Sequence, residues 1–322
     1  MSAPWITFRP ELKVLDCTIR DGGLVNSHLF DDDVVRAVYQ TCVESGIDYM
    51  ELGYKGSRKL FAPGKFGDWK FCDEDDMRRI VGDNDSSLKL AAMADAEKTD
   101  YHEDILPKEK SVLDVIRVAT YVHQIPVAID MIRDAADKGY EVTCNLMAVS
   151  VLQDAEIDQA LESLRDTPAS TVVVVDSFGS LYGEQIGRLV DRYRAAFEGT
   201  GKEVGIHAHN NQQLAFANTI ESIIHGCNRV DATMAGMGRG AGNCPMELLL
   251  GFLKNPSYRI RPVLQLLQEH FVGLREKLEW GALVPYNITG QLNQHPRGAI
   301  EMLSGEDRNN FVELYDRLVA DL

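Results

Sequence analysis

The sequence predicts an α/β fold, a closed (β/α)₈ barrel, from three observations. Short apolar segments alternate with amphipathic segments, which is typical of a parallel sheet. Eight such pairs fit within about 250 residues, the usual length of this barrel. One segment, Thr171–Val175, is the continuous β-branched run that a fully buried parallel strand requires. The alternative is an open doubly wound sheet, which usually carries a GxGxxG turn after its first strand; Asp21–Gly23 does not match that turn.

The expected elements follow one another as strand and helix, except after the third strand, where the helical pattern is ill-defined. Strands are expected over Lys13–Thr18, Tyr49–Tyr54, Leu88–Ala94, Val115–Tyr121, Val142–Val149, Ser170–Ser177, Glu203–Ala208 and Arg229–Met234. Helices are expected over Asp31–Ser45, Glu74–Val81, Pro126–Lys138, Ala155–Asp166, Glu184–Phe197, Leu214–His225 and Pro245–Leu253. Three aspartates open the first helix and suit its positive end.

Two regions stand outside this alternation. We expect residues 1–255 to form the barrel domain and residues 256–322 to form a helical C-terminal extension that covers the site or a subunit interface. Within the extension, Pro262–Trp280 has an amphipathic helical pattern, whereas Trp280–Met302 carries prolines and glycines that favour irregular structure. The other region is the loop Lys55–Cys72, which is either a solvated loop packed by its aromatic side chains or a basic lid that attracts an anionic substrate.

Composition narrows the function. The 322 residues carry a net charge of −16, which argues against nucleic acid and anionic membranes as partners. No apolar run is long enough to span a bilayer, and the N-terminus has no apolar signal-peptide core. The six cysteines are scattered without a CxxC pair, which suggests reduced thiols. We therefore expect a cytoplasmic enzyme, with a homodimer as the default assembly on base rates.

Polar residues gather where barrel strands are expected to end, which is where barrel enzymes place their chemistry. His207 and His209 are two positions apart on a strand, so both imidazoles share a face and can reach one cation. Asp21 follows the first strand and Asn243 follows the eighth. Such a mixed nitrogen and oxygen site suits Mg²⁺, Mn²⁺ or Zn²⁺. Arg20 either forms a structural ion pair with Asp21 or binds an anion in the barrel mouth.

Four motifs together resemble the HMG-CoA-lyase-like superfamily, also called DRE-TIM metallolyases or the pyruvate carboxyltransferase domain family. They are LDCTIRDGG, YMELG, HAHNNQQLAFAN and GMGRGAGNCPMELLL, within roughly residues 12–255. The resemblance implies a TIM barrel with one divalent metal that makes or breaks C–C bonds beside a carbonyl. By position it implies the following roles: Asp21, His207 and His209 as metal ligands, Asn243 at or near the metal, Arg20 as the group that stabilises an enolate, and Glu51 as the acid that supports Arg20.

Within this superfamily the chain resembles the 4-hydroxy-2-oxovalerate aldolases most. It shares with them VIRVAT, a DSxG after the sixth strand, GAGNxPxE, and a helical extension that supplies a tyrosine. By this resemblance Ser177 would hold the pyruvate carboxylate. The cysteine loop of the HMG-CoA lyases is absent, as is the RDGEQ of the isopropylmalate and homocitrate synthases. One departure matters: Leu24 stands where those aldolases carry a catalytic histidine.

The acid–base group must therefore be another residue. His28 ranks first because it lies in the same loop and has a suitable ordinary pKa, although it could equally lead into the helix without any chemistry. Tyr286 of the extension ranks second and Tyr54 third, since a tyrosine pKa near 10 needs help from a nearby cation.

The resemblance implies a Mn²⁺- or Mg²⁺-dependent aldolase that cleaves or condenses a small anionic 2-oxo acid through a pyruvate-type enolate. A metal and a guanidinium together can stabilise the negative charge of an enolate. The alternative is an acyltransferase that condenses an acyl-CoA with a 2-oxo acid on the same metal.

Overall fold

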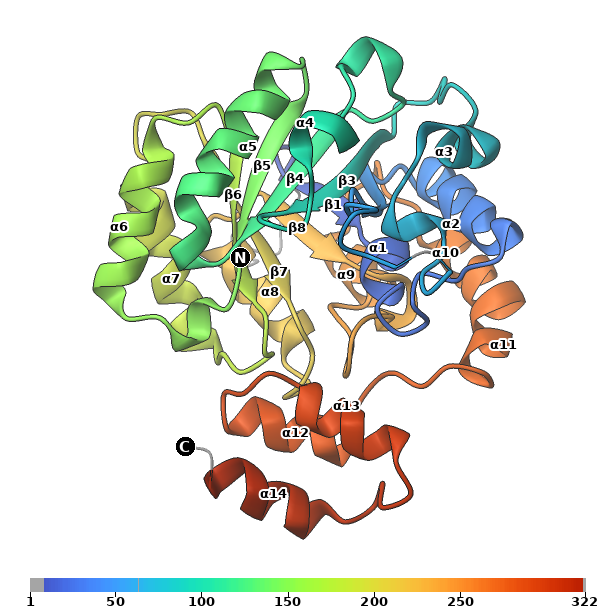
Figure 1. Cartoon of the computed structure of the whole chain (residues 1–322), viewed down its shortest axis with the longest axis vertical. Coiled ribbons are helices and arrows are strands. Elements are labelled where there is room, and N and C mark those ends of the chain that lie inside the picture. The colour runs from blue at the N-terminus through green and yellow to red at the C-terminus, as the bar shows by residue number, and fades with distance from the viewer. Residues whose placement is uncertain (1–8, 63, 321–322) are drawn as a thin grey trace.

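The computed structural model describes residues 9–62 and 64–320, and its sheet is a closed barrel of eight parallel strands in chain order (Figure 1). The predicted TIM barrel is confirmed. The last strand pairs with the first, with Leu15 opposite Asp231, so the barrel has no free edge. The strands are β1 Lys13–Asp16, β2 Tyr49–Tyr54, β3 Lys89–Asp95, β4 Val115–Thr120, β5 Glu141–Leu146, β6 Thr171–Asp176, β7 Glu203–Ala208 and β8 Arg229–Ala232.

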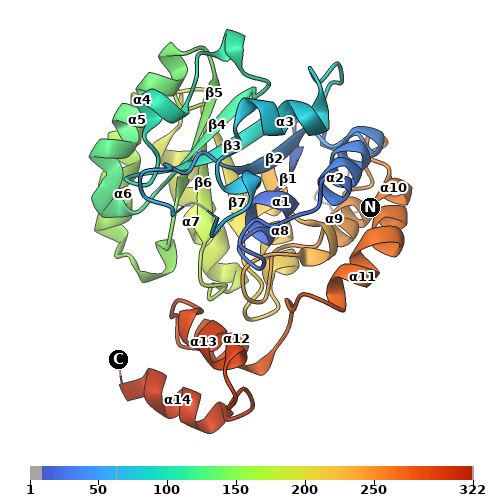
Figure 2. The same cartoon turned by 45° about the vertical axis from the view of Figure 1, so that its right-hand side comes forward.

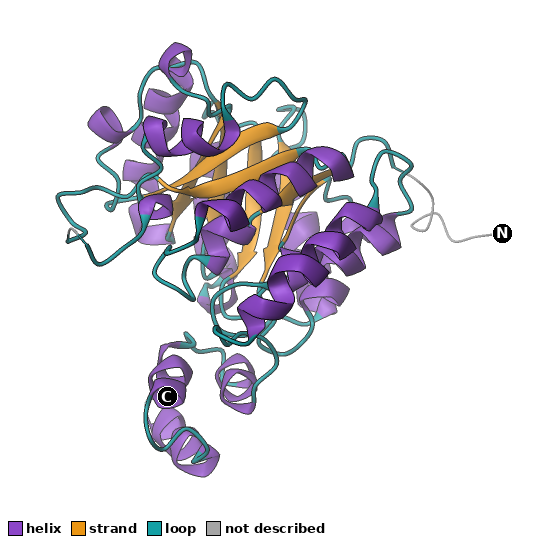
Figure 3. Cartoon of the chain, turned by 90° about the vertical axis from the view of Figure 1, so that its right-hand side faces the viewer, coloured by secondary structure: helices purple, strands orange, loops and turns teal. Residues whose placement is uncertain are grey.

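Helices surround the barrel, as the view coloured by secondary structure shows (Figure 3). Where the third helix was ill-defined, the structure has only the short α4. The helices are α1 Thr18–Gly22, α2 Asp32–Ser45, α3 Glu74–Val81, α4 Tyr101–Asp104, α5 Ile125–Asp137, α6 Asp154–Arg165, α7 Gly183–Ala196, α8 Ala215–Ile224, α9 Met246–Leu253, α10 Ile260–Leu266, α11 Val272–Arg275, α12 Val284–Gln291, α13 Arg297–Ser304 and α14 Phe311–Ala320.

The first strand is shorter than predicted, and this places the site. β1 ends at Asp16, whose carboxylate accepts hydrogen bonds from the Thr18 backbone N–H at 3.2 Å and from the Thr18 hydroxyl at 2.6 Å. This local turn is a known competitor of strand pairing. The chain therefore enters α1 at Thr18, and this single helical turn carries both Arg20 and Asp21.

The barrel interior is layered. Its lower layer is apolar and holds Leu15, Tyr49, Ala91 and Val115 in one buried cluster. Side chains two residues further along the strands belong to the next layer, because side-chain direction alternates along a strand. Glu51 and Arg117 occupy that position, two residues beyond Tyr49 and Val115, and these two charged side chains are buried. The main apolar core lies between the strands and the helices.

The second half of the extension is not irregular, and that expectation is wrong. α12, α13 and α14 form a helical cluster beyond one end of the barrel (Figures 1 and 2). Pro285 lies in the first turn of α12 and Pro296 immediately precedes α13, positions where proline starts a helix because no intrahelical N–H is needed there. The first half is helical as predicted, with a π-helical turn over Leu267–Phe271 between α10 and α11.

The carboxyl ends of the strands are covered from two sides. The extension lies over the loops that follow β5 to β8: Asn293 donates to the Ser150 carbonyl, and Asn287 donates to the Asn211 carbonyl. The loop Lys55–Cys72 lies over the other half, where the Gly67 backbone N–H donates to the Ser27 carbonyl at 3.0 Å. The barrel mouth is thus enclosed between these two segments.

Within residues 9–62 and 64–320, no helix combines the length and the apolar character that crossing a bilayer requires. All six cysteines are buried and none forms a disulfide.

Candidate metal centre and active site

Three of the predicted ligands meet at the barrel mouth. Asp21 comes from α1, His207 from the end of β7, and His209 follows that strand directly. The three offer ligand atoms that all lie within 4.8 Å of one another, and all three side chains are buried. His207 Nε2 is 3.2 Å from Asp21 Oδ2, and His209 Nε2 is 3.9 Å from the same oxygen.

The donor set fits a divalent cation. Both carboxylate oxygens of Asp21 and the Nε2 atom of His207 are buried without a hydrogen-bond partner among the described residues. The amide oxygen of Asn243 is likewise buried and has no hydrogen-bond partner among these residues. Buried polar atoms without partners are costly, so their convergence indicates a ligand that completes them. Carboxylate, imidazole and amide oxygen together are ligands for Mg²⁺, Mn²⁺ or Zn²⁺.

Backbone pairing brings Asn243 to the two histidines. The residue lies in the glycine-rich turn after β8, and it forms an isolated antiparallel bridge with His209. Gly238 permits this turn, since a Cβ there would lie 2.2 Å from the Asn243 amide nitrogen. The Gly236–Gly242 segment thus lets the backbone approach the candidate metal centre closely.

The other ring nitrogen of His207 is held by a carboxylate. His207 Nδ1 lies 3.0 Å from Asp231 Oδ2. Because Asp231 is ionised, Nδ1 carries the proton and the lone pair of Nε2 faces Asp21, which is the orientation that a metal-ligating histidine needs. Cys17, His207 and Asp231 also lie close together. They do not fit a metal, because Asp231 is already paired with Arg117 and burial raises the pKa of the Cys17 thiol well above its ordinary value.

A buried chain of charges links Arg20 to His207. Arg20 Nε donates to Glu51 Oε2 at 2.7 Å, and Arg117 donates to the same oxygen at 2.9 Å. The second guanidinium nitrogen of Arg117 then donates to Asp231 at 2.6 Å. Sequence reasoning predicted Arg20 and Glu51 but missed Arg117 and Asp231. The sequence did contain a sign of their role, because Arg117 and Asp231 are charged residues within strands that are otherwise largely apolar, VIRVAT and RVDA.

Electrostatics keep the Asp21 carboxylate ionised. Burial alone raises the pKa of Asp21, but the charge of Arg20, the largest opposing effect, holds the pKa well below its ordinary range. Burial lowers the pKa of His207, but the neighbouring carboxylates of Asp21 and Asp231 raise the pKa above the ordinary value. Burial holds the pKa of His209 well below its ordinary value. A carboxylate and a neutral imidazole are the protonation states that bind a metal.

Ser177 reaches the same face of the barrel. β6 pairs with β7 so that Val175 is opposite His207, which brings Ser177 level with His209 one step beyond the strand. The Ala148 backbone N–H donates to the Ser177 hydroxyl oxygen at 2.8 Å. The hydroxyl proton of Ser177 therefore remains available for a donor bond to an anion.

His28 is buried at the mouth and not on the surface. Its backbone is left-handed (φ 62°), and its ring meets the Tyr54 ring edge-on, with the two ring centres 5.4 Å apart. Gly23 makes room for it, since a Cβ there would lie 2.1 Å from His28 Nδ1. Burial, followed by the charges of Lys70 and Arg20, lowers the pKa of His28 to about 3.

The two tyrosine candidates differ in position. Tyr54 is buried beside Arg20, whose Cζ lies 5.9 Å from the centre of its ring, and burial raises its pKa above the ordinary value. Tyr286 packs in the small core of the extension. Burial and then the charge of Glu279 raise its pKa to about 12. The structure brings Tyr54 to Arg20, whereas it places Tyr286 in a cluster that contains none of the three candidate ligands.

A histidine ties the extension to the barrel. Arg239, in the turn after β8, lies 2.9 Å from His295 Nε2 and also donates to the Ser177 carbonyl at 2.6 Å. Arginine can only donate, so His295 Nε2 accepts and carries no proton. Burial and the charge of Arg239 lower the pKa of His295 to about 4.

This contact should make the extension sensitive to acid. Because the pKa of His295 is lower in the folded state than in the unfolded state, its stabilising effect is complete above about pH 6.5 and is lost as the pH falls toward about 4. We expect a loss on the order of 1 kcal/mol, since the ring is only partly buried. Urea unfolding of wild type and His295→Gln across this range checks it. The glutamine oxygen can accept from Arg239 at every pH, so parallel pH curves for the two proteins would contradict the prediction.

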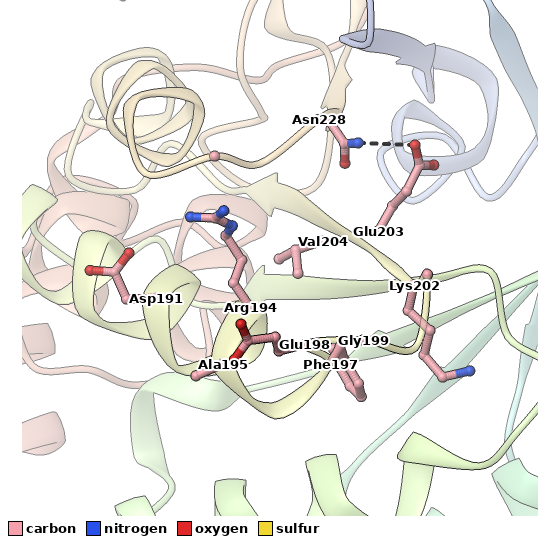
Figure 4. Close-up of a pocket in the computed structure, with 12 residues that line it drawn as sticks. Asp191, Arg194, Ala195, Phe197, Glu198, Gly199, Lys202, Glu203, Val204 and Asn228 are labelled. Carbon is pink, nitrogen blue, oxygen red and sulfur yellow. Dashed lines mark hydrogen bonds between the residues drawn. The ribbon is translucent and has the colours of Figure 1, made fainter.

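A pocket lies at the opposite end of the barrel from the candidate metal centre (Figure 4). Its volume is about 610 Å³, and it opens beside the start of β7. Its arginine, Arg194, already donates to the His225 carbonyl at 3.0 Å, and Asn228 donates to Glu203 at 2.9 Å. Barrel enzymes carry their chemistry at the carboxyl ends of the strands, so this pocket is not the active site.

The closed (β/α)₈ barrel and the buried carboxylate–imidazole cluster at its mouth place this protein in the class of TIM barrels with a candidate metal centre. The chain belongs to the HMGL-like family, whose profile matches residues 11–266. An oxaloacetate decarboxylase of Mycobacterium tuberculosis is 31% identical over 245 residues, which are 75% of this chain and 69% of that protein. A 4-hydroxy-2-oxovalerate aldolase of Bacillus cereus is 28% identical over 254 residues, covering 77% of this chain and 71% of that protein.

A solved structure shares the whole architecture. It is the N-terminal domain of a protein from Bacteroides vulgatus that is provisionally described as an aldolase. The two chains superpose with a TM-score of 0.83 at 28% identity, over 97% of this chain and 100% of that one. The match therefore includes the C-terminal extension as well as the barrel.

Proposed function

We propose that the protein is a divalent-metal-dependent carbon–carbon lyase that cleaves 4-hydroxy-2-oxo acids to pyruvate and a carbonyl compound. The observation that carries the proposal is the convergence of donor atoms of Asp21, His207 and His209, with those of Asp21 and His207 unpartnered, beside the guanidinium of Arg20, whose Nη1 lies 3.5 Å from Asp21. Family membership and the aldolase and decarboxylase names of the relatives support it. Both of those reactions break a C–C bond beside a 2-oxo group.

Arg20 is the residue of this chain that would stabilise the developing charge. A divalent ion held by Asp21, His207, His209 and Asn243 would polarise the 2-oxo group of the substrate. Nη2 of Arg20 is buried and has no partner in the described part of the chain, so it can donate to an enolate oxygen. Glu51 fixes the orientation of Arg20 through the 2.7 Å bond to Nε. Mg²⁺ and Mn²⁺ are both consistent with these ligands.

Ser177 would hold the substrate carboxylate. Its hydroxyl proton is free, because the hydroxyl oxygen accepts from the Ala148 N–H, and the residue lies level with His209 across the strand pair. A carboxylate bound there would lie next to the candidate metal centre, with the 2-oxo group between Ser177 and Arg20. The substrate would thereby be oriented before the bond breaks.

His28 is the proposed acid–base residue. The C3–C4 bond breaks as the 4-hydroxyl proton leaves, so that C4 becomes a carbonyl, and the enolate then takes a proton at C3 to give pyruvate. With a pKa of about 3 the imidazole is neutral at physiological pH and has a free lone pair. An anionic substrate beside the ring raises this pKa toward the range in which it can take the proton. His28 Nδ1 is buried without a partner among the described residues, so Nε2 is the nitrogen that would do so.

Replacing His28 by alanine should lower kcat at least about 10²-fold, the usual scale for loss of a general base, with metal content unchanged. Steady-state kinetics and metal analysis on the same samples check this. Tyr54→Phe and Tyr286→Phe serve as matched comparisons, since each removes one hydroxyl and keeps the ring. A His28→Ala enzyme with wild-type kcat, or a larger loss in either tyrosine variant, would assign the role elsewhere.

The proposed reaction is tested against the acyltransferase alternative by supplying both sets of substrates. The Mn²⁺-loaded protein is incubated with pyruvate and a series of aldehydes, and separately with acetyl-CoA and a series of 2-oxo acids. We expect 4-hydroxy-2-oxo acids from the first mixture and no free thiol from the second. Release of free CoA with consumption of the 2-oxo acid would show that the protein is the condensing acyltransferase and not an aldolase.

We also propose a cytoplasmic location for the protein. The six cysteines form no disulfide, which supports a reducing compartment.

A further inference from the structure

An ammonium group lies at the barrel mouth inside a box of aromatic rings. It belongs to Lys70, which ends the short 3₁₀ turn in the loop after β2 and whose side chain is only 7% exposed. Its Nζ lies over three ring faces, 4.1 Å from the centre of Phe61, 4.3 Å from Tyr54 and 5.9 Å from Phe66. Gly56 leaves space for the stem, since a Cβ there would lie 3.2 Å from Lys70 Cε.

The charge of Lys70 lacks a close anion. Among the residues that the structure describes, no carboxylate oxygen lies within 4.0 Å of its Nζ. Asp95 is the acid whose charge acts on it, but that carboxylate pairs with Lys98 at 3.5 Å. Ring faces offset only part of the cost of burying a cation. Burial lowers the pKa of Lys70 to about 8, so the group stays mostly protonated at neutral pH. Such a site is completed by an anionic ligand.

Lys70, Arg20 and His28 all lie against the Tyr54 ring. The guanidinium carbon of Arg20 is 5.9 Å from the centre of that ring and Lys70 Nζ is 4.3 Å from it, so the two cations are no more than about 10 Å apart. His28 contacts the same ring edge-on. A four-carbon chain with one hydrogen bond at each end also spans about 10 Å.

We propose that Lys70 binds a second carboxylate of the substrate, so that the preferred substrates are 4-hydroxy-2-oxo acids whose C4 carries a carboxylate. This inference rests on the proposed function and names its substrate class. The second carboxylate stays on C4 when the C3–C4 bond breaks, so the products are pyruvate and a second oxo acid. Lys70 is a specificity-determining residue here, because it contacts the part of the substrate that does not react.

Two substrates that differ in one group test the inference. In 4-hydroxy-2-oxoglutarate a carboxylate replaces the terminal methyl of 4-hydroxy-2-oxovalerate. For the Mn²⁺-loaded full chain we expect higher kcat/KM with the dicarboxylate. Lys70→Met should lower the ratio of the dicarboxylate's kcat/KM to that of the methyl substrate on the order of 10²-fold, because any effect through His28 is common to both substrates, and Lys70→Arg should retain part of the preference. Lys59→Met is the matched control, since it removes one exposed charge from the same loop, already paired with Asp100 and Glu103, and should leave that ratio unchanged.

Binding of uncleavable analogues separates this inference from the proposed function. The acids 2-oxoglutarate and 2-oxopentanoate lack the 4-hydroxyl group, and calorimetry measures their affinities for each variant, with melting temperatures recorded to confirm folding. If Lys70→Met weakens only 2-oxoglutarate while no hydroxy acid is cleaved by wild type, the carboxylate site stands and the aldolase proposal fails. If Lys70→Met or Lys70→Gln weakens both acids equally, or neither, the inference is overturned and the box is a packing feature.

Discussion

Replacing His207 by alanine should give a folded protein that neither retains a divalent ion nor cleaves its substrate. The change removes one of three ligand groups that lie within 4.8 Å of one another, and Asp231 keeps its partner Arg117. Asp21→Asn should behave alike, because it removes the only carboxylate of the set. Elemental analysis of the purified variants, with circular dichroism for the fold, measures both. Full metal occupancy in His207→Ala would contradict the assignment.

Two comparisons sharpen this result. His102→Ala removes a histidine that also contacts a carboxylate, Asp134, at 3.1 Å, but lies on the surface, so it should leave metal and rate unchanged. Arg20→Met should keep the metal and lose on the order of 10²–10³-fold in kcat, because only the charge-stabilising donor is removed. Equal losses of metal in the Arg20 and His207 variants would show that the two residues do not have separate roles.

Metal binding should also weaken in acid. In the metal-free protein the neighbouring carboxylates of Asp21 and Asp231 raise the pKa of His207, and protons therefore compete with the ion for its lone pair. The apparent affinity for Mn²⁺ should fall as the pH drops from about 8 to about 6. Calorimetric titrations at several pH values measure this dependence.

Arg117→Met should destabilise the protein by about 3–5 kcal/mol, the scale for breaking a buried ion pair from one side. Arg117 is buried inside the barrel and bonds both Glu51 and Asp231, and its loss leaves both carboxylates in an interior that water does not reach. Methionine keeps the unbranched apolar stem of the side chain and leaves a cavity no larger than the guanidinium. Urea unfolding of the metal-free protein measures the change without a contribution from bound metal.

The matched control is Arg79→Met on the surface. Arg79 pairs with three carboxylates, those of Asp32, Asp68 and Asp76, but it is 39% exposed. Water solvates these carboxylates when the arginine is removed, so the expected loss is about 1 kcal/mol or less. Similar losses for Arg79→Met and Arg117→Met would show that burial does not strengthen the dependence on Arg117.

Much of the candidate site follows from sequence because barrel geometry makes position along a strand informative. Once eight strands are recognised, residues at their carboxyl ends must meet at one mouth, whatever loops lie between. Asp21 and the two histidines are far apart in sequence, yet the fold class alone predicts that they converge. The alternation of side chains along β7 likewise places His207 and His209 on one face.

Other features depend on three-dimensional contacts that no local pattern expresses. Arg117 and Asp231 stand in apolar strands, and only barrel closure shows that they bond each other and complete the support of Arg20 and His207. The pKa of His28 depends on burial against Tyr54 and on the charge of Lys70, not on the ordinary value for histidine.

The sequence by itself determined the barrel, its chain order and the residue types at its mouth, because these follow from hydrophobic periodicity and short motifs. Only the tertiary structure decided what closes the mouth. Pro285 and Pro296 read locally as breaks, but they begin helices whose stability comes from packing in the core of the extension. The Lys70 ammonium could not be distinguished from a solvated lysine until Tyr54, Phe61 and Phe66 were seen around it, since burial and the distance between charges are properties of the folded chain.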